Sequence, residues 1–257
     1  MTIETNRIYN MDFLDLMKMI PDGFARMILT DPPYGIRYQN GYAYEKSLAI
    51  AGDTGIDYQE FADQSYRILA ENSHAYFFTR FDQYPYHYEC LNRAGFRIKN
   101  CLVIEKGDVG GIGDLYASYA NNCEWVIFGQ KGRKAFSKTK LLKNTSPIGK
   151  VASRKGNPIQ EYKTRFNCCW FGQSYPKATY NSATKAKYGN PHPTMKNVVF
   201  LEWLIQISSN PGDIVFDAFM GSGSTAIAAR NTGRLYLGSE IDPNHYDTAT
   251  KRLEMQL

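Results

Sequence analysis

The chain has 257 residues, of which 43% are hydrophobic, and its formal net charge at pH 7 is +5. This length fits one α/β domain with a modest insertion, and no segment resembles a signal peptide or the roughly 18 apolar residues of a membrane span. Five cysteines without C-x-x-C spacing and four scattered histidines argue against a disulfide scaffold or a metal site, so we expect reduced thiols.

Apolar periodicity and turn residues predict the elements of the first half of the chain. Residues 35–55 show little periodicity, which indicates a mobile loop over a site. A glycine-rich stretch, 107–113, follows the fourth strand. The expected strands cover 7–9, 25–30, 74–79, 98–106 and 123–128, and the expected helices cover 13–20, 58–69 and 86–94.

A strongly basic region follows the strand over 123–128. Residues 131–190 contain 14 Lys and Arg but one acid, Glu161, so this region carries +13 and the remainder of the chain carries −8. Such a run is often only a solvated surface. Here it is interleaved with aromatic residues such as Tyr162, Trp170 and Tyr180, a combination that suits phosphate neutralisation and base contact. We expect nucleic acid as the partner.

The pattern after residue 190 returns to compact α/β structure. Residues 192–196 open an amphipathic helix that continues through Ile205, and the chain closes with a helix from Pro243 to about Glu254. Between them lie strands over 214–216 and 235–239 and an alanine-rich helix that ends near Thr232. Seven strand candidates alternating mainly with helices predict a largely parallel, doubly wound sheet with helices on both faces.

The strand over 25–30 stops at the motif Asp31-Pro32-Pro33-Tyr34. Two prolines fix φ and remove two N–H donors, and the residue before a proline is held extended, so the strand cannot continue. The result is a stiff corner at the carboxyl end of a strand, where open α/β sheets bind ligands. By itself the motif fits a plain surface turn equally well.

A second motif runs from strand to acid to glycine turn to helix, over Phe216 to Thr225. Gly221 and Gly223 permit close approach of the backbone to a ligand, and Glu240 ends the next strand, where an acid can accept ribose hydroxyls. The spacing also matches a dinucleotide turn formally. However, four residues separate the strand from Gly221, and Asp217 would repel a pyrophosphate while suiting a cationic amino acid. A purely structural turn is the lesser alternative.

Together these motifs resemble the DNA amino-methyltransferases, and their order resembles the circularly permuted beta class. Phe78-Thr79-Arg80, Glu105-Lys106-Gly107 and His192-Pro193-Thr194-x-Lys196 also resemble that class, whereas Asn197 departs from its usual proline. The resemblance covers about 5–130 and 190–257. It implies a Rossmann-like methyltransferase sheet of about seven mostly parallel strands, divided into a catalytic half (1–130), an inserted basic target-recognition region (131–190) and a cofactor-binding half (191–257).

The resemblance also implies the cofactor, S-adenosylmethionine, and residues that hold it. Glu240 would hold the ribose, and Ile241 would pack on the adenine. Asp12 is similar to the acid that receives the adenine amino group, although it equally fits a helix N-cap. The remaining implied contacts enclose the amino-acid end and close the pocket: Asp31, Thr194, Lys196, Asp217, Phe219, Gly221, Gly223, Ser224 and Thr225.

The implied reaction is methylation of an exocyclic amine in double-stranded DNA. Asp31 and the Pro32 carbonyl would accept the amine hydrogens, Pro33 would stiffen the corner, and Tyr34 would stack on a flipped base. Adenine N6 is favoured over cytosine N4 because Asp31 stands where cytosine-N4 enzymes commonly carry Ser. The implied DNA contacts are basic residues: Lys131, Arg133, Lys134, Lys138, Lys140, Lys143, Arg154, Lys155, Lys163, Arg165, Lys177, Lys185 and Lys187.

Three other functions compete with this one: a dinucleotide-dependent oxidoreductase, a non-catalytic nucleic-acid-binding protein, and a methyltransferase acting on RNA or protein. The spacing between Asp217 and Gly221 disfavours the oxidoreductase, and Glu240 would have no use in a non-catalytic nucleic-acid-binding protein. The permuted order of the motifs disfavours RNA or protein as the methyl acceptor. We therefore expect a cytoplasmic restriction-modification type of enzyme, bacterial or phage-encoded, acting as a monomer or homodimer away from membranes. The sequence leaves open the recognition site and whether a partner nuclease exists.

Overall fold

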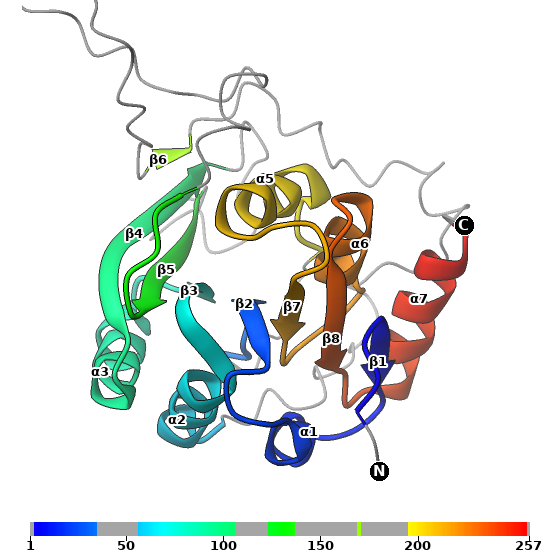
Figure 1. Cartoon of the computed structure of the whole chain (residues 1–257), viewed down its shortest axis with the longest axis horizontal. Helices are drawn as coiled ribbons and strands as arrows, with labels where there is room; N and C mark the ends of the chain where they lie inside the picture. The colour runs from blue at the N-terminus through cyan, green and yellow to red at the C-terminus, as the bar shows by residue number, and fades with distance from the viewer. Residues whose placement is uncertain (1–2, 35–55, 106–122, 137–168, 171–194, 256–257) are drawn as a thin grey trace, which may run out of the picture.

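A computed structural model of the chain describes residues 3–34, 56–105, 123–136, 169–170 and 195–255 (Figure 1). The loop expected over 35–55, the glycine-rich stretch 107–113 and most of the basic region lie outside the described residues. Of the candidate site residues, Thr194 and the ten basic residues from Lys138 to Lys187 also lie outside them.

The described elements follow the predicted alternation of strands and helices. The helices are α1 (Phe13–Met19), α2 (Tyr58–Ile68), α3 (Tyr84–Ala94), α5 (Val198–Ser208), α6 (Ser224–Asn231) and α7 (Pro243–Glu254). The strands are β1 (Arg7–Tyr9), β2 (Ala25–Thr30), β3 (Leu69–Thr79), β4 (Arg97–Glu105), β5 (Cys123–Lys131), β6 (Cys169–Trp170), β7 (Ile214–Asp217) and β8 (Leu235–Ser239). None of the described helices is long and apolar enough to cross a membrane.

The strands form one sheet in the order β1-β8-β7-β2-β3-β5-β4-β6. Every neighbouring pair is parallel except those made by β5, which runs antiparallel to both β3 and β4. The predicted mostly parallel sheet is therefore confirmed, and β6, a two-residue strand from within the basic region, extends it to eight strands. Because β5 is reversed, its first residues lie at the edge where the parallel strands end.

Helices cover both faces of the sheet, and alternate strand residues face the two layers (Figure 1). On β2, Met27 and Leu29 pack in the core beneath α5, α6 and α7, whereas Ile28 packs in the core beneath α1, α2 and α3. All three side chains are fully buried. This two-sided burial explains why β2 reads as a continuous apolar run rather than as an alternating pattern.

Element boundaries differ from the sequence prediction at several points, and the starts of β3 and α5 differ most. Strand β3 begins at Leu69 rather than at residue 74, and its pairing with β2 shifts register between Ala25 and Met27. Helix α5 begins at Val198, later than the predicted opening over 192–196. The Asn197 side chain accepts hydrogen bonds from the backbone N–H groups of Val199 and Phe200 and so fixes the helix start.

Candidate active site

Asp31 lies directly after β2, at the carboxyl edge of the sheet, as the sequence predicts. Its carboxylate is held on both sides: the Tyr34 hydroxyl donates a hydrogen bond to Oδ1, and the Lys196 ammonium lies 2.9 Å from Oδ2. The side chain is 24% exposed. Burial, followed by the Asp31 charge, raises the pKa of Tyr34 well above its ordinary value, so the phenol stays protonated and donates.

The Tyr34 ring is backed by two further rings. It lies 6.4 Å from His87 in a stacked arrangement, and His87 stacks on Tyr58 at 3.8 Å with an interplanar angle of 5°. His87 Nδ1 is also 2.8 Å from the Thr79 hydroxyl at the end of β3. Burial lowers the pKa of His87 to about 4, so the ring behind Tyr34 is neutral at pH 7. These contacts fix the aromatic corner of the site.

Lys196 joins Asp31 to a residue that the motifs did not single out. Its ammonium lies 3.2 Å from Oε1 of Glu124, the second residue of β5, and 4.7 Å from the centre of the Phe78 ring. Burial alone would lower the pKa of Lys196, but the charges of Asp31 and Glu124 outweigh it and raise that pKa above its ordinary value. The resemblance implies a cofactor contact for Lys196, which stays a prediction, and the described polar contacts of its ammonium are these two carboxylates.

Asp217 occupies the end of β7, the strand beside β2. Oδ1 accepts hydrogen bonds from the Thr30 hydroxyl at 2.7 Å and from the Phe219 backbone N–H at 3.0 Å. The residue is buried, and desolvation raises the pKa of its carboxyl to about 6, although hydrogen bonds from Thr225, Thr30 and Phe219 oppose the shift. A buried carboxylate with a raised pKa is a recurrent feature of ligand sites.

The glycine turn is held against Glu240 at the end of β8. Gly221 donates its backbone N–H to Oε2 of Glu240 at 2.7 Å, and Asp242 donates to Oε1 at 2.9 Å. Gly221 and Gly223 have φ values of 51° and 78°, the left-handed region in which glycine is favoured. Burial raises the pKa of Glu240, and the two backbone donors oppose that shift. Each carboxylate oxygen retains a lone pair for a further donor.

Glycine is also required inside β8. A Cβ atom on Gly238 would lie 2.0 Å from the carbonyl oxygen of Asp217 on β7. The two strands could not keep this spacing with any side chain at position 238. This close approach therefore helps to hold the end of β7 beside the end of β8, where Asp217 and Glu240 lie.

The start of α6 is enclosed by the final helix. Ser224 and Thr225 are buried, and Arg252 of α7 donates to the Ser222 carbonyl oxygen and lies 3.4 Å from the Ser224 hydroxyl. Sequence reasoning missed Arg252 because a basic residue near the end of an amphipathic helix fits an ordinary surface cation. The predicted role of Ser224 and Thr225 toward a cofactor carboxylate stays a prediction.

Three residues that follow the carboxyl ends of β1 and β8 complete the surroundings of the site. Asp12 accepts a hydrogen bond from the Leu14 backbone N–H at 2.8 Å and caps α1, which confirms its structural alternative and leaves a cofactor role untested. Ile241 is 48% exposed, and its contact with the cofactor adenine stays a prediction. Asn10, which the motifs did not identify, donates to the carbonyl oxygens of Glu240 and Ile241.

Three of the basic residues assigned to DNA binding lie at the opposite edge of the sheet. Lys131 pairs with Ser73 at the far end of β5, and its ammonium donates to the Tyr66 carbonyl oxygen at 2.8 Å. Arg133 and Lys134 follow it there. Antiparallel β5 thus carries the chain away from Asp31 before the basic region continues, and the predicted contact of these three residues with DNA stays a prediction.

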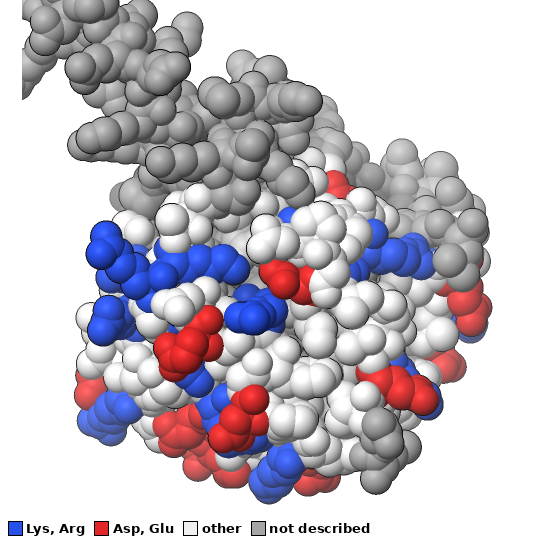
Figure 2. Space-filling view, in the orientation of Figure 1, with Lys and Arg blue, Asp and Glu red and all other residues white. Residues whose placement is uncertain are grey.

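Acidic and basic side chains are not separated into two regions on the surface of the described residues. In the view of Figure 2, basic side chains gather toward the side formed by β4 and β5, while acidic and basic side chains are interspersed over the helices below.

In the described part of the chain, no group of three or more His, Cys, Asp or Glu side chains is arranged to hold a metal ion.

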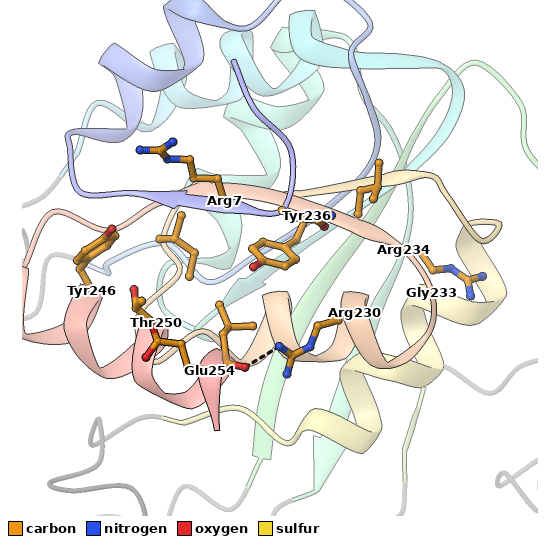
Figure 3. A pocket seen from close by; sticks show the side chains of 12 residues that line it. Arg7, Arg230, Gly233, Arg234, Tyr236, Tyr246, Thr250 and Glu254 are labelled. Atoms are coloured by element: carbon orange, nitrogen blue, oxygen red, sulfur yellow. Dashed lines mark hydrogen bonds between the residues drawn. The ribbon is translucent and has the colours of Figure 1, made fainter. Parts of the chain in front are cut away.

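A hollow of about 610 Å³ lies between β1, β8, α6 and α7 (Figure 3). Its lining includes Arg7, Tyr236 and Glu254, and Arg230 donates to the Leu253 carbonyl oxygen at its wall. Leu235 and Tyr236 begin β8, whereas Glu240 follows its end. The hollow is therefore distinct from the candidate site.

The strand order places four acids along one edge of the sheet. Glu240 follows β8, Asp217 ends β7, Asp31 follows β2, and Glu124 lies near the start of β5. Although the partly buried Lys196 lies between two of them, this edge suits a positively charged ligand and a group that donates N–H bonds. It provides acceptors on the Asp31 side and a glycine turn on the Asp217 side.

The chain is similar both to a known protein family and to a named bacterial protein. Residues 25–251 match the N6_N4_Mtase family model, described as DNA methylase. The DNA adenine methyltransferase YhdJ of Escherichia coli (strain K12) is 30% identical over 263 residues, covering 98% of this chain and 84% of that protein.

Two solved structures share the fold. M1.HpyAVI in complex with SAM aligns with a TM-score of 0.61 at 22% identity, covering 96% of this chain and 98% of that one. The cytosine-N4-specific PvuII DNA methyltransferase aligns with a TM-score of 0.61 at 18% identity, covering 98% and 87%.

Proposed function

The chain belongs to the N6/N4 DNA methylase family, and we propose that it transfers the methyl group of S-adenosylmethionine to the N6 amine of adenine in DNA. One observation carries the proposal. The acid-proline corner that would hold the amine and the acidic glycine turn that would hold the cofactor are joined by the 2.7 Å hydrogen bond between Thr30 and Asp217.

The residues around the glycine turn fit the chemistry of this cofactor. Asp217 offers a carboxylate to a cationic amino group, and the free lone pairs of Glu240 suit two ribose hydroxyls. The exposed Ile241 side chain offers an apolar face to a purine ring. When bound, S-adenosylmethionine supplies an electrophilic methyl group on a positively charged sulfur.

The Asp31 corner would activate the amine by hydrogen bonding. An exocyclic amine is a poor nucleophile because its lone pair is delocalised into the base. The Asp31 carboxylate and the Pro32 carbonyl oxygen, accepting its two N–H bonds, favour a pyramidal nitrogen whose lone pair points at the methyl group. The methylated nitrogen then releases a proton readily, so positioning and charge stabilisation supply most of the rate.

Access to the amine requires the base to leave the duplex. Tyr34, backed by His87 and Tyr58, offers a fixed ring on which a flipped base would stack. The basic residues from Lys131 to Lys187 would neutralise DNA phosphates and supply sequence readout.

Adenine N6 is preferred over cytosine N4 on two grounds. The first residue of the corner is Asp31 rather than the serine common in cytosine-N4 enzymes, and the E. coli relative is named a DNA adenine methyltransferase. The PvuII structural neighbour is named cytosine-N4-specific, and the same two-acceptor geometry would serve either amine. Cytosine N4 is therefore the second candidate.

The test is direct identification of the product. Unmodified amplified DNA is incubated with the protein and methyl-labelled S-adenosylmethionine, digested to nucleosides and separated by mass. The proposal predicts labelled N6-methyladenine, and no label in a reaction with Asp31→Ala. Labelled N4-methylcytosine without N6-methyladenine would replace the proposal with its alternative.

A further inference from the structure

Glu124, Lys196 and Asp31 form a chain of two ion pairs that the motifs did not predict. The Lys196 ammonium lies 2.9 Å from Asp31 Oδ2 and 3.2 Å from Glu124 Oε1. The lysine side chain is only 14% exposed, and both carboxylates are largely covered. Such partly buried, hydrogen-bonded charge pairs fix geometry more strongly than exposed pairs do.

The lysine is held at its ammonium and through the backbone that follows it. Its ammonium lies over the Phe78 ring at 4.7 Å, and the next residue, Asn197, caps α5 through Val199 and Phe200. Phe200 is buried in the core, so the backbone that carries Lys196 is anchored by α5. Glu124 is likewise fixed, because it belongs to β5 and pairs in register with Ile104 of β4.

We propose that Lys196, oriented by Glu124, is a positioning residue that fixes the Asp31 carboxylate for the target amine. This inference rests on the proposed function. Lys196 holds Oδ2 and Tyr34 holds Oδ1, so the plane of the carboxylate is set from both sides. Each oxygen offers two lone pairs, so an N–H of the target base finds an acceptor already aimed.

The Asp31 carboxylate also carries the charge that the reaction needs. Methyl transfer moves positive charge from sulfur to the amine nitrogen, and a carboxylate beside that nitrogen stabilises the change. Glu124 shares the Lys196 ammonium with Asp31, so the lysine is not paired with Asp31 alone.

The experiment separates positioning from cofactor binding by measuring two quantities on each variant. Calorimetry gives the dissociation constant for S-adenosylmethionine, and single-turnover transfer to unmodified amplified DNA at saturating cofactor gives the rate constant. Lys196→Met should reduce the rate roughly 100-fold, the cost of a misplaced reacting group. The dissociation constant for S-adenosylmethionine should stay within about threefold of the wild-type value. Loss of a charged hydrogen bond to the cofactor would weaken binding by more than that. Lys196→Arg, which keeps the charge, should recover most of the rate.

A double-mutant cycle tests the role of Glu124. Glu124→Gln should slow transfer about tenfold in the wild-type background, the factor expected of one charge-assisted hydrogen bond. It should cost less than about twofold when Lys196→Met is already present, because residues that act through one another are not additive. Glu89→Gln, which breaks the exposed Arg93–Glu89 pair on α3, is the matched control and should leave both quantities unchanged.

The results that would contradict the inference differ from the result that would contradict the proposed function. A tenfold or greater rise in the dissociation constant of Lys196→Met, with its saturated rate preserved, would make Lys196 a cofactor contact and overturn the inference. Equal costs of Glu124→Gln in both backgrounds would show that Glu124 does not act through Lys196. If Lys196→Met fails to fold, Glu124→Gln against Glu89→Gln decides alone, and an unchanged rate refutes the inference. An inactive wild-type protein would instead refute the proposed function.

Discussion

The Thr30 hydroxyl donates a 2.7 Å hydrogen bond to Asp217, and so joins two motifs that lie 187 residues apart in the chain. Burial raises the pKa of the Asp217 carboxyl to about 6, and this hydrogen bond is one of three that oppose the rise. If the Asp217 carboxylate receives the cofactor amino group, affinity for S-adenosylmethionine should fall about tenfold per unit as the pH drops below 6.

Thr30→Val keeps the shape of the side chain and removes the donor. The pKa of Asp217 should then rise further, so the curve of affinity against pH should move to higher pH while its alkaline limit is preserved. Calorimetry between pH 5 and 9 on both proteins measures this. Superimposable curves would show that Asp217 does not bind the cofactor in its charged form.

Glu240→Ala should weaken cofactor binding by tenfold or more, because one hydrogen bond to a charged group contributes roughly 1.5–3 kcal/mol. The substitution also removes the acceptor of the Gly221 and Asp242 backbone N–H groups. Calorimetry gives the dissociation constant, and thermal unfolding without cofactor reports loss of the backbone acceptor separately. An unchanged dissociation constant would remove Glu240 from the site.

DNA binding should depend steeply on salt through the basic region. Neutralising Lys138 with Lys140, or Arg154 with Lys155, should flatten the plot of log K against log salt by about 0.9 for each phosphate that the protein no longer neutralises. Changing Lys18 and Arg93 together is the matched control, since both are exposed on helices outside the basic region. Equal slopes for all these variants would mean that the basic region does not bind phosphates.

Two buried histidines should make the protein acid-labile. Burial lowers the pKa of His74 and of His87 from 6.5 to about 4, so the unfolded chain binds protons that the folded chain does not. Stability is therefore complete above pH 6.5 and is lost as the pH falls toward 4, by about 2 kcal/mol for each histidine at pH 5. Asp217 acts in the opposite sense, because its raised pKa lets the folded state gain a proton between pH 6 and 3.8.

Urea unfolding at pH 7.5, 6 and 5 measures this dependence. His74 contacts the Ser208 hydroxyl at 2.9 Å and lies away from Asp31, so His74→Gln tests the effect without disturbing the site. The variant should be less stable at pH 7.5, and its stability should fall less steeply with acid than that of the wild type. An unaltered slope would show that His74 titrates in the folded protein.

The features predicted from sequence are those encoded locally. Prolines end β2 at Asp31, glycines with positive φ form the turn before α6, and apolar runs mark the buried strands. Each depends on neighbours in the chain, so the pattern alone identifies it.

The features that were missed depend on distant contacts. Glu124 reaches Lys196 only because β5 runs antiparallel and begins at the active edge, and no residue near Glu124 signals that direction. Lys131, which the sequence places among the DNA contacts, donates to the Tyr66 carbonyl oxygen at the far edge of the sheet. Both cases require the sheet order, which short motifs do not contain.

We propose that Asp31 acts on the amine while the Asp217 and Glu240 side of the edge holds the cofactor. Asp31→Ala, assayed by single-turnover methyl transfer to unmodified DNA and by calorimetry with S-adenosylmethionine, tests it most directly. We predict a loss in transfer rate of at least about 100-fold, as for removal of one preorganised catalytic group, with cofactor affinity nearly unchanged. Transfer near the wild-type rate, or a loss explained wholly by weaker cofactor binding, would contradict the account.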